Sequence, residues 1–233
     1  LLGTFITRSG LLTSVHAFAS DPDRGFFILA ILGITVGGAL LLFAFRAPLM
    51  KSEFGFDLVS REILLLSNNV ILVVAAASVF LGTLFPMVYQ AITDDLISIG
   101  PPYFNAIFIP LMALLALLLS IGPYTRWKRT STTYLMQQLG KIALAALTLG
   151  VVLPLLVTRQ ISLPATMAIA IGSWIMLAML QDLVNKTANK ATRLKGLRAL
   201  SFSYYGMQMA HMGMAIMLIG VALTSSFSSE RSV

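Results

Sequence analysis

The chain alternates between long apolar segments and short polar ones. The apolar segments are 26–45, 63–89, 103–124, 139–158, 163–184 and 204–227. A helix needs about 20 apolar residues to cross the hydrocarbon core of a bilayer, so each segment is long enough to span it. The second is longest and is expected to tilt or to extend beyond the membrane. The pattern predicts an all-α, polytopic membrane bundle with six transmembrane helices.

This pattern divides the chain into three parts. Residues 1–25 are interpreted as the end of an upstream helix followed by an external polar segment that contains His16. Residues 26–227 form the six-helix region, and residues 228–233 begin another external segment. Because the chain starts with Leu1 rather than Met, and carries no signal-peptide pattern, we expect it to be an internal piece of a longer protein.

Composition and charge place the chain in a membrane and orient it. The chain is 58% hydrophobic and only 11% charged, with a net charge of +7, whereas soluble domains are roughly a quarter charged. Twelve of the sixteen basic residues lie in the loops 46–62, 125–141 and 185–203. The positive-inside rule makes these loops cytoplasmic and places His16 and the C-terminus outside. The basic charge therefore indicates membrane orientation and not a nucleic-acid partner.

His211 lies within the sixth apolar segment, about seven residues and roughly 10 Å from its start. An imidazole in a bilayer usually has a partner or a function, and metal ligation is its commonest function. A histidine that hydrogen-bonds a neighbouring helix explains the residue pattern equally well. The same segment carries a predicted packing stripe of small residues, Gly206, Gly213 and Gly220. The imidazole would then face another direction, with Ala210 and Ala215 leaving space for a flat group.

His16 lies in a polar segment, S-V-H-A-F-A-S-D-P. A solvent-facing histidine at a helix–loop junction is the simpler interpretation of those residues alone. The two histidines should be about 15–20 Å apart in depth, given a core about 30 Å thick. If both histidines ligate haem iron, they would therefore bind two different iron atoms. Each iron would need a second ligand from elsewhere, because this chain has no third histidine. Met207 and Met214 adjoin His211, but methionine is more often packing filler.

Residue types and motifs that are missing from the sequence exclude several kinds of chemistry. The chain has no cysteine, which excludes disulfides, iron–sulfur clusters and thioether attachment of haem to this chain. Catalytic triads, phosphate-binding loops and zinc signatures are absent from the sequence. Asn68 and Asn69 are expected to be structural amides that bridge helices. A transporter or scaffold with structural histidines remains an alternative, disfavoured because no charges pair at mid-membrane.

Long blocks of the sequence resemble a known family. They are L-L-G-T-F-I-T-R-S-G-L-L-T-S-V-H-A-F-A-S-D-P-D-R-G, S-R-E-I-L-L-L-S-N-N-V, L-G-T-L-F-P, I-S-I-G-P-P-Y-F-N and S-Y-Y-G-M-Q-M-A-H-M-G-M-A. Together they resemble the haem lyase subunit of cytochrome c maturation, the CcmF family of the CcmF/NrfE/CcsA-like superfamily. The resemblance runs from end to end of the chain. A paralogous lyase dedicated to one multihaem cytochrome, of the nitrite reductase type, is an alternative within the superfamily.

The resemblance implies roles for individual residues. His16 matches an external histidine that ligates haem in transit, and His211 matches a membrane histidine that holds a resident b-type haem. Arg8 is a candidate partner for a haem propionate, by its charge and position. The family's tryptophan-rich external segment lies upstream and is not reproduced by Trp127 or Trp174. With each haem site half present, we expect the chain alone to be inactive.

The resemblance also implies an activity, partners and a location. The family attaches reduced haem to apocytochrome c, receiving it from a CcmE-like haem chaperone and working with a CcmH-like thiol-handling subunit. Quinol is an expected electron source for the resident haem. The expected location is the bacterial inner membrane, in contact with lipid, with His16 on the periplasmic side and the basic loops in the cytoplasm.

Overall fold

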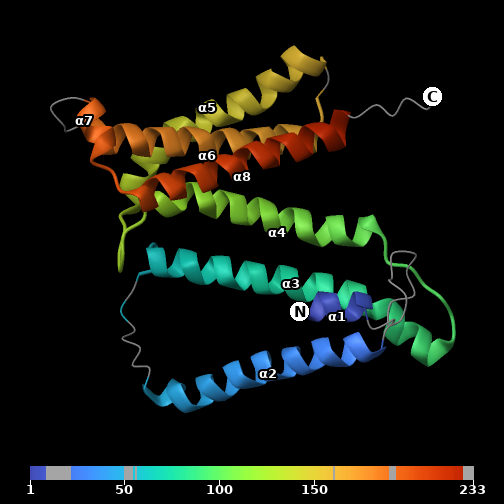
Figure 1. Cartoon of the computed structure of the whole chain (residues 1–233). Coiled ribbons are helices and arrows are strands. Elements are labelled where there is room, and N and C mark those ends of the chain that lie inside the picture. The colour runs from blue at the N-terminus through green and yellow to red at the C-terminus, as the bar shows by residue number, and fades with distance from the viewer. Residues whose placement is uncertain (9–21, 50–54, 56, 160, 189–192, 228–233) are drawn as a thin grey trace. The chain divides into compact units, whose positions relative to one another are not determined.

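The computed structural model describes residues 1–8, 22–49, 55, 57–159, 161–188 and 193–227 (Figure 1). Within these ranges every regular element is helical, which confirms the all-α fold. The α-helices are α1 (Leu2–Arg8), α2 (Pro22–Arg46), α3 (Arg61–Thr93), α4 (Pro101–Ile121), α5 (Thr132–Thr158), α6 (Leu163–Ala188), α7 (Arg193–Arg198) and α8 (Phe202–Phe227). Short 3₁₀ turns follow α2 and α4, at Ala47–Leu49 and Gly122–Tyr124.

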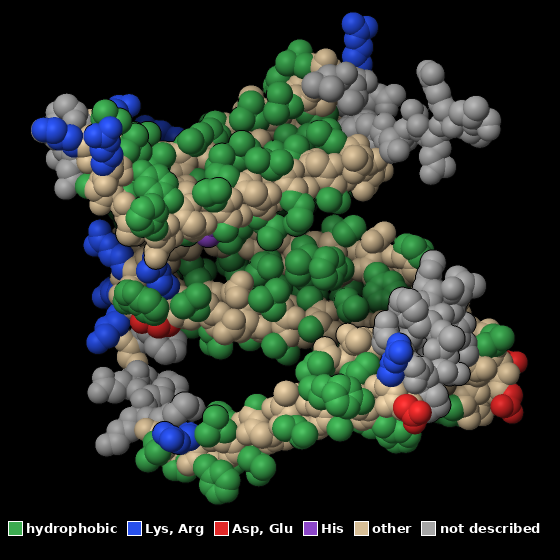
Figure 2. Space-filling model, in the orientation of Figure 1, with side chains coloured by type: hydrophobic (Ala, Val, Ile, Leu, Met, Phe, Trp, Pro, Cys, Tyr) green, Lys and Arg blue, Asp and Glu red, His purple; other side chains and the backbone are tan. Residues whose placement is uncertain are grey.

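Six of the described helices are long and apolar enough to cross a membrane: α2, α3, α4, α5, α6 and α8. Each overlaps one of the six predicted apolar segments. The 33 residues of α3 extend about 50 Å at 1.5 Å per residue, well beyond a core of about 30 Å. Figure 2 shows apolar side chains along the helices, with Lys and Arg mostly near helix ends. The six long apolar helices, with charged side chains mostly near their ends, are those of a polytopic membrane protein.

The chain forms two compact units. One comprises residues 1–54 and 78–104, and the other residues 55–77 and 105–233. In the first unit, the second part of α3 crosses the start of α4. The Tyr103 hydroxyl donates a hydrogen bond to the Ser78 carbonyl at 3.2 Å. Any side chain at Gly82 would overlap the Tyr103 ring, so this glycine permits the close crossing.

The second unit is built around α6, which packs against both α5 and α8. Small residues make each crossing close. A Cβ at Gly150 of α5 would lie 2.7 Å from the Ala170 side chain, and one at Gly172 of α6 would lie 2.6 Å from Ile219 of α8. Membrane helices associate by such close packing because lipid gives no hydrophobic drive between them. The core cluster is Ala116, Tyr124, Leu139, Ile175, Ala178, Met179 and Ala215.

The loop after α4 is bound to the segment that precedes α3. The Asp57 amide donates to the Lys128 carbonyl at 2.7 Å, and the Thr130 amide donates to the Val59 carbonyl at 2.7 Å. The Glu62 carboxylate accepts the Lys128 amide with both oxygens at 3.0 Å. Lys128 has a positive φ of 67°, which turns the loop back toward α3. We call this end of the second unit its basic end, because it carries five cationic side chains: Arg61, Arg126, Lys128, Arg129 and Lys186.

The predicted glycine stripe on α8 is wrong for the described residues. A Cβ at Gly206, Gly213 or Gly220 would meet nothing within 4 Å. The packed face of α8 instead centres on Ala215, which is fully buried against α6 and leaves no space for a flat group. The close approach comes from the glycine of the partner helix, Gly172, so α8 does not need its own glycines at the crossing.

The prediction that Asn68 and Asn69 bridge helices is also not met. The Asn68 amide donates to the Asn69 side-chain oxygen at 3.4 Å, a long hydrogen bond between neighbours on the same helix. Asn69 is exposed and Asn68 is half-buried. Asn68 therefore remains available to line a cavity.

Candidate functional site

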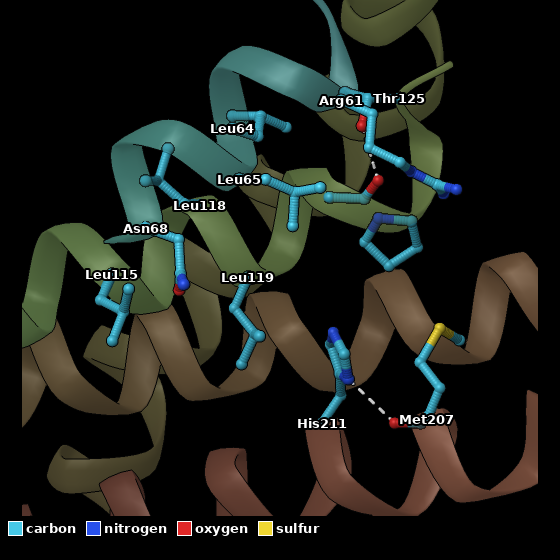
Figure 3. A pocket seen from close by; sticks show the side chains of 12 residues that line it. Arg61, Leu64, Leu65, Asn68, Leu115, Leu118, Leu119, Thr125, Met207 and His211 are labelled. Carbon is cyan, nitrogen blue, oxygen red and sulfur yellow. Dashed lines mark hydrogen bonds between the residues drawn. The ribbon is translucent and has the colours of Figure 1, made fainter. Parts of the chain in front are cut away.

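A cavity of about 340 Å³ lies within the second unit, between the first part of α3, α4, the turn after α4, and α8 (Figure 3). It is lined by Arg61, Leu64, Leu65, Asn68, Leu115, Leu118, Leu119, Gly122, Pro123, Thr125, Met207 and His211. A volume of this size is at the lower end of ligand-binding pockets in proteins. His211 is thus placed on the wall of a mainly apolar space.

Helical spacing explains which side chains reach this cavity. Arg61, Leu64, Leu65 and Asn68 follow the i, i+3, i+4, i+7 pattern and so share one face of α3. Leucines of α4 at similar spacing form the facing wall. The cavity therefore has apolar walls with polar groups at separate positions: Arg61 and Asn68 from α3, and His211 from α8 (Figure 3).

The hydrogen bond made by His211 determines its tautomer. Its Nδ1 lies 2.8 Å from the carbonyl oxygen of Met207, one turn earlier on α8. A carbonyl oxygen only accepts hydrogen bonds, so Nδ1 carries the hydrogen. In the neutral ring, Nε2 then holds the free lone pair. This is the arrangement of a metal-binding histidine, in which the bond at one nitrogen orients the ring and the other nitrogen is the ligand.

A polar network holds α8 against α6 and so sets the direction in which His211 points. The Tyr204 hydroxyl donates to Asp182 at 2.8 Å, and the Gln208 amide donates to the Met179 carbonyl at 3.2 Å. Gln208 also donates to the Tyr204 oxygen at 2.6 Å. Lys186 pairs with Asp182 at 3.2 Å. Because these bonds and the buried Ala215 lie on the α6 side of α8, they fix the rotation of α8.

Two of the three predicted site residues, His16 and Arg8, have side chains that the structure does not describe. His16 lies outside the described residues. Arg8 is the last residue of α1, and its side chain is not among those described. No group of three or more His, Cys, Asp or Glu that could hold a metal occurs in the described part of the chain.

Sequence reasoning missed Arg61 and Asn68 as cavity residues. Both belong to one of the blocks that carry the family resemblance, but their joint position was not recognised. The available signal was two polar residues seven apart, with leucines between them, at the start of an apolar segment. Only the folded arrangement of α3, α4 and α8 brings this face of α3 to a cavity.

Comparison with known proteins places the chain in a family. No family model matches it. It is 48% identical over 233 residues to the cytochrome c-type biogenesis protein CcmF of Pseudomonas fluorescens and 42% identical to that of Escherichia coli K12. It is 35% identical over 234 residues to NrfE of Haemophilus influenzae. Each alignment covers all of this chain and 35% of the relative, so the chain spans about a third of their length.

A solved structure named cytochrome c heme lyase CcmF has a similar fold. The TM-score is 0.66, over 91% of this chain and 31% of that one, at 24% sequence identity. The likeness of folds agrees with the sequence relatives, which match the chain along its whole length. This chain belongs to the CcmF family of cytochrome c-type biogenesis proteins.

Proposed function

We propose that His211 is one axial ligand of a b-type haem held within the membrane, and that the chain is part of a haem lyase that attaches reduced haem to apocytochrome c. The observation that carries this proposal is the hydrogen bond from Nδ1 of His211 to the Met207 carbonyl. That bond leaves Nε2 as the free donor atom of a ring that lines a largely apolar cavity. The names of the relatives support the wider role in cytochrome c biogenesis.

The chemistry of the cavity residues fits such a group. Haem is a flat apolar macrocycle with two anionic propionates and an iron that takes nitrogen ligands. The cavity offers an imidazole nitrogen, leucine walls and one guanidinium. The second axial ligand is proposed to come from outside the described residues. When bound, haem supplies one-electron chemistry whose potential depends on its axial ligands and on the polarity around it.

The residues of this chain would hold the haem in place and adjust its reduction potential. The Met207 carbonyl keeps the imidazole in one tautomer and makes Nε2 a stronger donor. The leucines of α3 and α4 exclude water and lower the local polarity. His16 is proposed as an axial ligand for haem in transit at the periplasmic face, with Arg8 near a propionate. The basic loops are proposed to be cytoplasmic.

The proposed partners follow from this role. A haem chaperone would deliver haem at the periplasmic face, and a thiol-handling subunit would present the reduced cysteines of apocytochrome c. Quinol in the membrane is the proposed electron donor to the haem at His211. The higher identity to CcmF proteins, 39–48% against 35% for NrfE, favours general cytochrome c maturation over a lyase for a single multihaem protein.

Paired histidine variants of the full-length protein test the proposal. His211→Ala should abolish the reduced-minus-oxidised b-type haem spectrum of the purified protein, because the iron loses an axial bond. His16→Ala should keep that spectrum but stop production of c-type cytochromes in cells. A full spectrum in His211→Ala, from protein that is folded, would refute the ligand assignment. Normal cytochrome production in His16→Ala would refute the periplasmic role.

A further inference from the structure

The cavity that contains His211 is polarised along its length. Arg61, the first residue of α3, contributes a cation at the basic end, while Leu64, Leu65 and the leucines of α4 make the walls apolar. Asn68 lies two turns beyond Arg61 on the same face, about 10 Å along the axis. Figure 3 shows Arg61 at one end of the group, with His211 reaching in from the facing helix. Such a space suits an amphiphile with an anionic end.

Arg61 differs from nearby cations in how its charge is balanced. Arg129 pairs with Asp57 at 3.2 Å, and Lys186 pairs with Asp182 at 3.2 Å. Among the described residues, no carboxylate lies within salt-bridge distance of the Arg61 guanidinium. The guanidinium stacks instead over the Trp127 ring at 5.5 Å, an interaction that orients the group without neutralising it. A half-buried cation beside an apolar space favours an anionic ligand.

The backbone around Arg61 is held in place independently of that side chain. The Arg61 amide donates to the Arg126 carbonyl at 3.0 Å, and the neighbouring Glu62 carboxylate accepts the Lys128 amide. The start of α3 and the loop that carries Trp127 therefore form one connected structure. A neutral side chain at position 61 should leave these backbone bonds intact.

We propose that Arg61 binds the propionate carboxylates of the haem whose iron His211 ligates, so that the haem lies with its anionic edge toward the basic end. The proposal rests on the proposed function of His211. Arg61 would be a positioning residue: its guanidinium offers five donors that match carboxylate geometry, and charge-assisted bonds of this kind are about twice as strong as neutral ones. Removing them would weaken binding of haem and change its orientation without removing an iron ligand.

Arg126 provides a matched control. It has the same charge, and its guanidinium stacks over the Tyr134 ring at 5.4 Å, as Arg61 stacks over Trp127. It belongs to the same basic end but does not line the cavity. A general effect of lost positive charge on folding or membrane insertion should therefore appear in Arg126→Gln as well as in Arg61→Gln.

The test uses the full-length protein, depleted of haem and reconstituted with either protohaem or its dimethyl ester, which lacks the propionate charges. Wild type should bind the diacid at least roughly tenfold more tightly than the ester, because the ester cannot form the charge-assisted hydrogen bonds to Arg61; tenfold corresponds to about 1.4 kcal/mol. Arg61→Gln should weaken diacid binding by a similar factor and leave ester binding unchanged. Arg61→Lys should retain part of the preference, and Arg126→Gln should retain all of it.

The reduction potential gives a second measurement. Loss of the Arg61 charge should lower the potential of the bound diacid, because a nearby cation favours the reduced iron, and Arg126→Gln should change it less. Equal affinities of wild type for diacid and ester would overturn the proposal, even if Arg61→Gln does not accumulate. An unchanged preference in folded Arg61→Gln would do the same. Failure of the proposed function is distinguishable, because it would appear as an intact haem spectrum in His211→Ala.

Discussion

Helices α6 and α2 are similar in length, 26 and 25 residues, and both are apolar enough to span a membrane, yet they pack very differently. In the most apolar stretch of α6, 44% of the residues are buried, whereas none are in that of α2. α2 is also the more hydrophobic of the two. Hydrophobicity therefore predicts that a helix crosses a membrane, but it does not predict where the helix packs in this structure.

Small and polar residues explain the difference. α6 carries Gly172 at its crossing with α8, and Gln181 and Asp182 form hydrogen bonds to neighbouring helices. α2 also contains glycines, but at Gly33 and Gly37 no described atom comes within 4 Å of the Cβ position. In lipid, helices associate through close packing and hydrogen bonds because burial of apolar surface gives no advantage there. The crossing of α6 and α8 combines both, and it is this crossing that directs His211 into the cavity.

The largest expected loss of stability comes from placing a large side chain where α6 crosses α8. Gly172→Leu would drive its side chain into Ile219 and the backbone at Ala215, where even a Cβ would lie 2.6–3.1 Å from existing atoms. Overpacking of this kind costs about 1–3 kcal/mol or more, and separation of α8 from α6 should also remove the haem spectrum. Gly37→Leu on α2, with open space, is the control. The measurements are thermal unfolding in detergent and haem content per protein. Equal stability of the two variants would contradict the comparison.

A smaller effect should follow from removing the acid of the polar network. Asp182 is 6% exposed, and Asp182→Ala leaves the Tyr204 hydroxyl and Lys186 without their acceptor. A buried polar group that loses its partner costs about 1–3 kcal/mol. Chemical denaturation of the full-length protein should show a loss within that range. A loss below about 0.5 kcal/mol, the usual limit for surface substitutions, would mean that the network does not hold α8.

The smallest effect is expected for Tyr204→Phe. This change removes one hydroxyl, but Asp182 keeps Lys186 and Gln208 keeps the Met179 carbonyl. A single net hydrogen bond contributes about 1 kcal/mol. The double variant with Asp182→Ala should destabilise by less than the sum of the single changes, because both remove the same bond. Strict additivity in the same denaturation assay would show that the two residues are not coupled.

Much of the fold could be predicted from the sequence, but less of the site. The apolar segments predicted all six long helices, although α5 begins at Thr132, seven residues earlier than expected. The apolar pattern missed these first turns because they contain polar residues such as Gln138, whose oxygens accept hydrogen bonds from the Gln181 amide of α6. His211 was recognised as a candidate because an imidazole is unusual in an apolar helix. Its cavity was not, since the cavity depends on residues of α3, α4 and the turn after α4, which lie 86 to 150 positions earlier in the chain.

Local chemistry in the sequence determined the class of protein, the number of long helices and the candidacy of His211, because hydropathy and residue type are properties of single segments. Only the tertiary structure decided that α8 packs through Ala215 and not through its glycines, and that Arg61 and His211 share one cavity. Those features depend on the rotation of each helix about its axis. That rotation is set by hydrogen bonds and close contacts with neighbouring helices, which no single segment contains.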